Sequence, residues 1–386
     1  MLLIQIGEDE MINKQRLINK FFEYVKIDSE SFNEKEMADT LIKEMKELGM
    51  KVRTDTAGEN VGSNANNVYG YLDGDLSIEP ILFCAHMDTV KPGKGIKPII
   101  KDEVIYSSGD TILAGDDKAG ISSILEAIRT IRDKSLSHGP IEVVFTIAEE
   151  EGLYGAKGVE YEKLASKKGF IVDSSKEVGA VITKAPAESQ ITVKIKGKAS
   201  HAGVEPENGI SAIQVAAYAI SNMKLLRIDE ETTANIGIIT GGKATNVVCP
   251  YVEVKAEARS LNMDKLNAQI KHMTDCFKKA SEKFGAEVEV NSELSYENYT
   301  ISEDDEILEI IREACDKIGV TFKLASTGGG SDVNVFASKG IKTVNLGTGM
   351  SKDHTTEEYI KVKDLINISK LIFQIMIRDN KIISDK

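Results

Sequence analysis

A histidine and an aspartate stand two positions apart at the end of an apolar run. The run "ILFCAHMDTV" covers residues 81–90 and contains His86 and Asp88. Side chains at positions i and i+2 of a β-strand project to the same face, so these two point together. Open α/β sheets place their sites at the carboxyl ends of buried strands. The pair is therefore either a metal ligand with its orienting acid or a satisfied pair in the core, and the two residues alone do not decide.

Further acids and a second histidine occupy comparable positions along the chain. Asp116 and Asp117 stand in "LAGDDKAG", in a loop before a helix, where a carboxylate can also cap the helix N-terminus; that reading suits Asp117 better than Asp116. Glu149–Glu151 directly follow the apolar strand "VVFTIA", and Asp173 ends the strand "GFIVD". His354 lies in a loop after the strand "KTVNL". A triple acid is usually a solvated turn, but burying charge at a strand end is costly without a compensating cation or partner.

Together these side chains favour a metal site over a purely structural role. Three strand ends deliver a histidine, a glutamate and an aspartate, while two loops add an aspartate and a histidine. Mixed histidine and carboxylate ligands suit zinc or a similar divalent ion. Five such groups exceed the needs of one tetrahedral site with an open position. They fit two ions that share a bridging carboxylate and lie ~3.5–4 Å apart.

The elements that must position these groups follow an α/β pattern. Strands are expected at "VYGYL", "ILFCAHM", "IEVVFTIA" and "GFIVD", and helices near the N-terminus and at about 117–133. Ser31 and Glu34 are expected to form a capping box for a second helix that Gly49 closes. Near-continuous apolar strands separated by helices predict a mostly parallel sheet flanked by helices.

A different pattern of apolar and polar residues begins near residue 184. "SQITVKIKG", "ANIGIITGG" and "YVEVKAEARS" alternate apolar and polar residues, as half-exposed antiparallel strands do, and two amphipathic helices are interleaved with them. The pattern of apolar strands separated by helices returns after about residue 297. The sequence therefore predicts an α/β domain in two parts, 1–184 and 298–386, interrupted by a smaller α+β domain at 185–297.

Composition narrows the classes of partner and compartment. Acidic residues outnumber basic ones 61 to 48, which gives a net charge of -13 and speaks against a nucleic-acid partner. The N-terminal "MLLIQIGEDE" lacks the features of a secretion signal, and no apolar stretch is long enough for a membrane span. The four cysteines are scattered, so no disulfide scaffold is expected. We expect a reduced, cytoplasmic protein.

The sequence resembles a known family, the co-catalytic zinc metallopeptidases of the aminoacylase and carboxypeptidase G type, and within it the peptidase T-like members. The matching stretches span residues 81–360 in family order. They are "AHMDTV", "LAGDDKAG", "AEEEGLYGA", "IVDSS", "KASHAGVEPENGISAI", "GGKATNVV", "EARS", "GGGSDVN" and "HTTEEYI". One departure is "IAEEEG", where peptidase T has an aspartate before the glutamate pair.

The resemblance implies a ligand set and a cofactor. His86 and Asp173 would hold one ion, Glu150 and His354 the other, and Asp116 would bridge both. The implied cofactor is two divalent metal ions per subunit, with zinc as the expected metal. The family also has a catalytic domain interrupted by a lid domain, which agrees with the change of pattern near residue 184.

The resemblance also implies roles for residues that are not ligands. Asp88 would support His86 as a catalytic-site acid, and Glu149 would be the general base. His201, Asn246 and Arg259, all in the interrupting domain, would contact the substrate. In several relatives the histidine comes from the partner subunit, so a homodimer through the lid is implied.

The implied reaction is hydrolysis of short peptides by a di-metal exopeptidase of tripeptide aminopeptidase type. A deacylase of N-acyl amino acids is a second possibility, because the family hydrolyses both kinds of amide. A catalytically silent, metal-dependent binding protein is a third. The presence of Glu149 together with every ligand argues against the silent relative.

Overall fold

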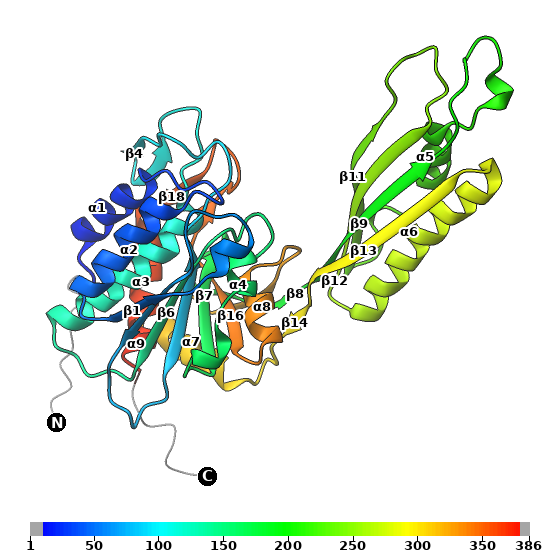
Figure 1. Ribbon diagram of the computed structural model, residues 1–386. Coiled ribbons are helices and arrows are strands. Elements are labelled where there is room, and N and C mark those ends of the chain that lie inside the picture. Colours follow the sequence, from blue (N-terminus) through cyan, green and yellow to red (C-terminus); the bar gives the residue numbers. More distant parts are fainter. Residues whose placement is uncertain (1–10, 379–386) are drawn as a thin grey trace. The chain divides into compact units, whose positions relative to one another are not determined.

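The structure, a computed structural model, describes residues 11–378 (Figure 1). The chain divides into two compact units. The first comprises the residues up to Thr183, Ile301–Ser326 and the chain from Ser331 onward; the second comprises Lys184–Thr300 and Thr327–Gly330. The N-terminal decapeptide, for which we expect no secretion signal, lies outside the described residues.

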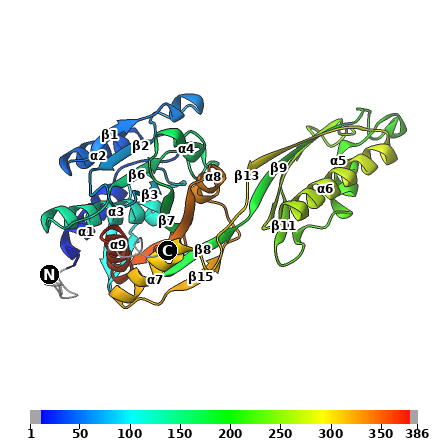
Figure 2. The same cartoon turned by 90° about the horizontal axis from the view of Figure 1, so that it is seen from below.

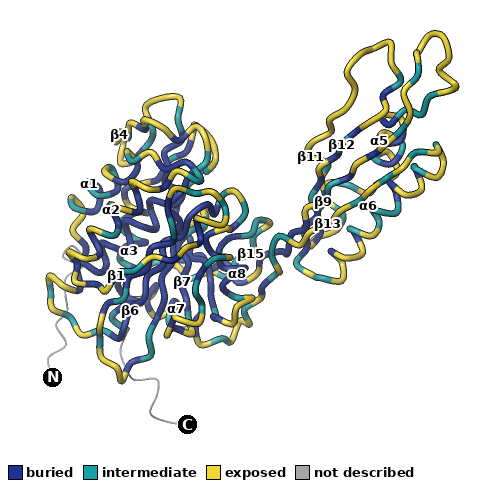
Figure 3. The backbone as a smooth tube through the Cα atoms, viewed as in Figure 1, coloured by how far each residue is buried: buried dark blue, intermediate teal, exposed yellow. Residues whose placement is uncertain are grey.

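A sheet whose central strands are parallel and whose outer strands are antiparallel forms the centre of the first unit. Its four parallel strands are, in spatial order, β6 (Ile141–Thr146), β3 (Ile81–His86), β7 (Lys168–Ser174) and β16 (Lys342–Gly347). Antiparallel strands extend the sheet on both sides: β1 (Lys51–Thr54) and β2 (Val68–Leu72) beyond β6, and β8 (Ala180–Ala185) beyond β16. The strand β15 (Lys323–Ser326) also pairs with β8, and β14 (Tyr299–Thr300) pairs antiparallel with the last two residues of β8, which like β14 belong to the second unit. The central strands are buried on both faces, as parallel strands under helices are (Figure 3). The α/β fold class predicted from the sequence is confirmed.

Helices cover this sheet on both faces (Figure 2). On one side α3 (Gly115–Asp133) packs against β3 and β7. The helices α1 (Lys14–Val25) and α9 (Val362–Met376) both contact α3, and α7 (Glu306–Ile318) contacts α9. On the other side α8 (Asp332–Ser338) packs against β16, next to α4 (Tyr154–Lys157). Alternation along β3 separates the faces. Phe83 and Ala85 belong to the main apolar core, whereas the Cys84 thiol donates toward Asp332 of α8 at 3.8 Å.

The predicted capping box at the second helix is wrong. The helix α2 spans Lys35–Glu47, and Gly49 follows it with a φ of 77°, but neither Ser31 nor Glu34 caps its N-terminus. The backbone N–H of Lys35 instead donates to Oδ1 of Asn64 at 2.9 Å. The Ser31 hydroxyl instead donates to Asp88, and the Glu34 carboxylate accepts backbone N–H groups from outside the helix. Contacts with residues distant in the sequence, Asp88 for Ser31 and Ala148 for Glu34, replace the predicted local hydrogen bonds.

The second unit is built on a five-stranded antiparallel sheet. Its order is β10 (Leu226–Arg227), β11 (Thr232–Gly241), β12 (Tyr251–Ser260), β9 (Ala187–Lys196) and β13 (Glu287–Tyr296). Two helices, α5 (Ala212–Ser221) and α6 (Met263–Phe284), pack against it and enclose a core of its own. Asn262 caps the start of α6, and Gly285, with a φ of 74°, ends it.

A small four-stranded sheet in the first unit holds the hairpin that precedes α9. Its order is β17 (Met350–Ser351), β18 (Tyr359–Lys361), β5 (Val104–Ser107) and β4 (Pro98–Lys101). Within residues 11–378, no helix combines the length and the apolar character that crossing a membrane requires. All four cysteines are unbridged and buried.

Candidate active site

The carboxyl end of β3 meets two acids to form a first group of potential ligands. His86, the last residue of β3, is 2% exposed. Its Nε2 atom lies 3.0 Å from Oδ1 of Asp116 and 3.6 Å from Oδ1 of Asp173, which comes from the end of the neighbouring strand β7. One potential ligand atom from each of the three residues lies within 4.8 Å of the other two.

A second group shares one of these acids. His354 stands in the loop between the paired strands β17 and β18, and its Nε2 atom lies 3.0 Å from Oε2 of Glu150 and 3.3 Å from Oδ2 of Asp116. One potential ligand atom from each of Asp116, Glu150 and His354 lies within 4.8 Å of the other two. Asp116 thus turns one carboxylate oxygen toward each histidine, at the start of α3.

The other nitrogen of His86 faces Asp88. His86 Nδ1 lies 3.1 Å from the carbonyl oxygen of Asp88 and 3.4 Å from its Oδ1 atom. A proton on Nδ1 leaves the Nε2 lone pair directed at the first group, which is the role of an acid that orients a histidine ligand. Asp88 is fully buried, and it also accepts the backbone N–H groups of Glu149 and Glu150 at 3.0 and 3.2 Å.

Burial and mutual repulsion shape the electrostatics of these acids. Burial, with the charge of Asp116 adding to it, raises the pKa of Asp173 to about 8. Burial likewise raises the pKa of Glu149, and the charge of Asp173 adds to that effect. Burial opposes ionisation of Asp116 as well, but hydrogen bonds from His354 and His86 outweigh it and leave the pKa below its ordinary value. Hydrogen bonds to Asp116 and Glu150 raise the pKa of His354 to about 11.

The chemistry of this donor set fits two divalent cations. The carboxylates of Asp116, Glu149, Glu150 and Asp173 gather around two imidazoles, so a pair of divalent ions would balance their formal charge. The Oε1 atom of Glu150 is buried and has no hydrogen-bond partner among the described residues. Buried carboxylates without partners are costly unless a cation compensates them.

Asp117 behaves differently from its neighbour. Its Oδ1 atom accepts the backbone N–H of Gly120 at 3.0 Å, which is the contact of a helix N-cap. A Cβ atom at Gly120 would come within 2.5 Å of that same oxygen, so the close approach requires glycine. The capping role considered for Asp117 therefore describes its contact, while Asp116 alone of the two joins the ligand groups.

Two buried residues that hold this region were not singled out in the sequence. The Glu358 carboxylate accepts backbone N–H groups from Leu113, Ala114 and Asp116 at 2.8, 2.9 and 3.1 Å. Lys118, which is fully buried, donates through Nζ to the carbonyl oxygens at positions 87 and 88. Glu358 follows His354 by only four residues, and an acid at that spacing in "HTTEEYI" was the available signal.

The three remaining predicted residues belong to the second unit. The loops of His201 and Asn246 run side by side, because Ala202 donates its backbone N–H to the Asn246 carbonyl at 3.0 Å and His201 forms a β-bridge with Val247. His201 is exposed, and its Nδ1 atom accepts the N–H of Gly203.

Arg259 is already engaged by carboxylates of its own unit. Its Nε and Nη2 atoms donate to the two oxygens of Glu257 at 3.1 and 2.9 Å. Nη2 also lies 3.0 Å from Oε2 of the buried Glu188, which accepts the Tyr296 hydroxyl at 2.6 Å. Arg259 thus shows the bidentate geometry of a carboxylate clamp, with side chains of the protein as its present partners.

Comparison with known proteins places these features in context. The sequence model of the protein family "Peptidase family M20/M25/M40" matches residues 82–378 of this chain. The uncharacterized protein YqjE of Bacillus subtilis (strain 168) is 41% identical over 95% of this chain and 99% of its own length. The structure of aminopeptidase PepT from Bacillus cereus ATCC 10987 is 44% identical, with a TM-score of 0.88 over 95% of this chain and 98% of that one. A tripeptidase from Staphylococcus aureus subsp. aureus Mu50 is 40% identical over the same shares, 95% and 98%, with a TM-score of 0.92.

Proposed function

The chain belongs to peptidase family M20/M25/M40, and on this premise we propose that it is a two-metal exopeptidase acting on short peptides. The family match and the similar structures of an aminopeptidase and a tripeptidase make the chain a hydrolase of peptidase type. The resemblance to the co-catalytic metallopeptidases is thereby confirmed. The metal, the general base and the preferred peptide are what we propose beyond this.

One observation carries the proposal, namely the position of Asp116 between the two ligand groups. Its Oδ1 and Oδ2 atoms lie 3.0 Å from His86 Nε2 and 3.3 Å from His354 Nε2. An acid that offers one oxygen to each side supports a shared ligand of two ions, as in co-catalytic sites. We propose that His86 and Asp173 complete one ion site and that Glu150 and His354 complete the other. Zinc is the proposed metal, since it accepts this mixture of ligands.

In the proposed mechanism Glu149 moves the proton. When bound, the ions supply Lewis-acid polarisation of the scissile carbonyl and lower the pKa of the attacking water. Glu149 accepts a proton from that water and later donates it to the leaving amine. Burial and Asp173 raise the pKa of Glu149 in the protein alone, and nearby positive charge acts in the opposite direction. Asp88 meanwhile keeps the Nδ1 proton of His86 in place.

The proposed substrates are peptides with a free N-terminus, tripeptides in particular. The similar structures at 44% and 40% identity are those of an aminopeptidase and a tripeptidase, which favours peptides over N-acyl amino acids. We propose that His201, Asn246 and Arg259 contact the substrate; for Arg259 a substrate carboxylate would replace Glu257 or Glu188 as partner. We also propose a homodimer formed through residues 185–297.

A substrate panel tests the proposed function. Zinc-loaded protein is assayed against tripeptides, dipeptides, peptides blocked at either end and N-acyl amino acids, with the metal-free protein as control. We expect hydrolysis of free tripeptides and none of peptides blocked at the amino end. Preference for N-acyl amino acids would establish the deacylase instead. Two bound ions without any hydrolysis would indicate a binding protein.

A further inference from the structure

Two buried carboxylates from distant parts of the chain hold the turn that follows β6. Three successive backbone N–H groups of this turn point at them. The N–H of Ala148 donates to Glu34 Oε1 at 3.0 Å, and those of Glu149 and Glu150 donate to Oδ1 and Oδ2 of Asp88 at 3.0 and 3.2 Å. The proposed general base and a proposed ligand thus stand on backbone fixed from outside the turn.

The turn needs such support because its backbone is unfavourable on its own. Ala148 has a φ of 44°, in the left-handed region that residues other than glycine seldom adopt. A residue in that region persists when the surrounding structure holds it there. The bond from Ala148 N–H to an ionisable acceptor provides that restraint at the residue before Glu149.

The segment from Ser31 to Glu34 supplies one carboxylate and supports the other. Glu34 is fully buried; its Oε1 atom also accepts the N–H of Phe32 at 2.9 Å, and its Oε2 atom accepts the Ser63 hydroxyl at 2.7 Å. The Ser31 hydroxyl donates to Oδ2 of Asp88 at 2.7 Å. The segment therefore reaches the turn directly through Glu34 and indirectly through Asp88.

We propose that Glu34 and Ser31 are positioning residues for Glu149 and Glu150. They touch neither substrate nor ion, and they act by fixing the backbone from which these two side chains project. The inference rests on the proposed function for the identity of the base and the ligand. The arrangement of N–H groups that it uses is independent of that function.

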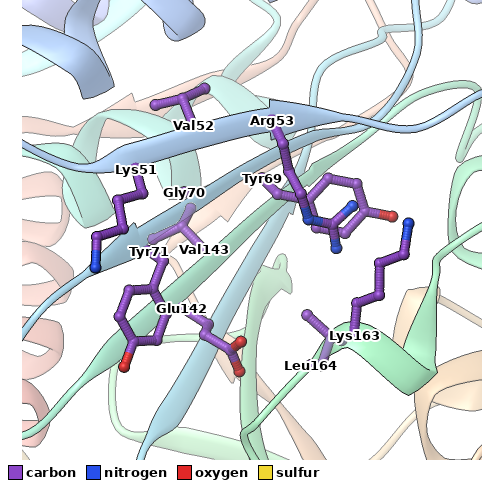
Figure 4. Close-up of a pocket in the computed structure, with 10 residues that line it drawn as sticks. All are labelled: Lys51, Val52, Arg53, Tyr69, Gly70, Tyr71, Glu142, Val143, Lys163 and Leu164. Carbon is purple, nitrogen blue, oxygen red and sulfur yellow. The ribbon is translucent and has the colours of Figure 1, made fainter.

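Glu142, on the strand β6 that leads into the turn, provides a matched control for Glu34. It is 6% exposed and accepts two backbone N–H groups, from Ala165 at 3.1 Å and Ser166 at 2.8 Å, as Glu34 accepts those of Phe32 and Ala148. It lies near the start of β6, beside a groove of about 260 Å³ lined also by Lys51, Tyr71 and Lys163 (Figure 4). Its replacement removes a similar kind of contact at the far end of the strand from the ligand groups.

The test compares Glu34→Ala, Glu34→Gln and Ser31→Ala with Glu142→Ala and Glu142→Gln. Thermal unfolding, kcat, KM and the absorption spectrum of cobalt-substituted protein are measured for each. Glu34→Ala should lower kcat by about 10–100-fold, the range for residues that orient active-site groups, with a smaller change in KM. Glu34→Gln keeps an oxygen that can accept the Ala148 N–H, so it should recover most of kcat. Ser31→Ala should lower kcat less than Glu34→Ala.

The Glu142 variants should lower Tm without changing kcat or the cobalt spectrum. A kcat for Glu34→Ala that equals that of Glu142→Ala would overturn the proposal. If Glu34→Ala does not fold, an unchanged kcat and an unchanged cobalt spectrum in Ser31→Ala would overturn it as well. The cobalt spectrum separates this inference from the proposed function. Should wild-type protein hydrolyse no peptide, a spectrum altered by Glu34→Ala but not by Glu142→Ala would still support the positioning role.

Discussion

Replacing Glu358 by glutamine should loosen the loop of Asp116 without removing any proposed ligand. Glu358 is 1% exposed, and its Oε2 atom accepts the N–H groups of Leu113 and Ala114, while Oε1 accepts that of Asp116. The side-chain amide of glutamine offers one oxygen, which accepts, and one NH2 group, which only donates. With the oxygen facing Leu113 and Ala114, the NH2 group faces the Asp116 N–H, and one bond to a charged acceptor is lost.

The size of this effect follows from that single bond. Burial, with the charge of Asp116 adding to it, raises the pKa of Glu358 to about 7, so the carboxylate is charged at about pH 8.5. A hydrogen bond to a charged group contributes about 1.5–3 kcal/mol, and the free energy of unfolding of metal-free Glu358→Gln at that pH should fall by that amount. Zinc affinity should fall by about 10–100-fold, because the backbone of the shared acid is no longer fixed. Glu358→Ala leaves three N–H groups without their acceptor and should cost more on both measures.

Urea unfolding of the metal-free protein and calorimetric titration with zinc measure the two effects separately. Glu142→Gln is the control. Glu142 lies near the start of β6, remote from the ligands, and its carboxylate accepts the backbone N–H groups of Ala165 and Ser166, so glutamine weakens a similar pair of hydrogen bonds. It should lower stability and leave zinc affinity unchanged. If Glu358→Gln binds zinc as tightly as the wild type while losing stability, the carboxylate only fills the core, and the positioning argument fails.

Four further outcomes follow from the site. Glu149→Ala should keep both ions by elemental analysis and lose about 10²–10⁴-fold in kcat; near-normal turnover would refute its role as base. Asp116→Ala should weaken both zinc sites in a titration, whereas His354→Ala should weaken mainly one, and equal losses would argue against bridging. The pKa of Asp173 is raised from 3.8 to about 8, so the folded metal-free protein binds more protons than the unfolded chain between these values. Its free energy of unfolding should fall as pH rises through that range, and the gain in Tm on adding zinc should be larger at the upper end. Arg259→Ala should lower kcat and affinity for free peptides and add little for carboxyl-blocked ones, while additive losses would contradict the clamp.

The grouping of the acids was predictable because topology dictates it. Parallel strands place their carboxyl ends at one edge of a sheet, so His86 at the end of β3 and Asp173 at the end of β7 had to be neighbours once the α/β pattern was recognised. Glu150 follows β6 on the other side of β3 by the same rule. Asp116 and His354 lie outside the strands, so topology does not group them with these ligands; their residue types made them candidates, and the family resemblance supplied their roles as the bridge and as a ligand of the second ion.

The residues that hold the loops were not predictable, because their partners are far away in the sequence. Glu34 is 114 positions from Ala148, and Glu358 is 242 positions from Asp116. Local rules assigned Ser31 and Glu34 to a capping box, the pattern that their spacing favours in isolation. In the fold, Ser31 donates to Asp88 after β3 and Glu34 accepts the N–H of Ala148 after β6, and a local rule does not consider such distant partners.

These buried acids explain how loops without regular structure can hold ligands in register. Glu34 and Asp88 bind the N–H groups of the turn at 148–150, and Glu358 binds those of the loop at 113–116. Neutral acceptors would bind the same groups more weakly, since hydrogen bonds to charged acceptors are about twice as strong. Where they are ionised, these acids add to the negative potential of the ligand acids; burial raises the pKa of Glu34 and of Glu358, the latter to about 7, so that contribution grows with pH. The framework that aligns the ligands therefore also increases their attraction for cations, at the cost of greater repulsion when the cations are removed.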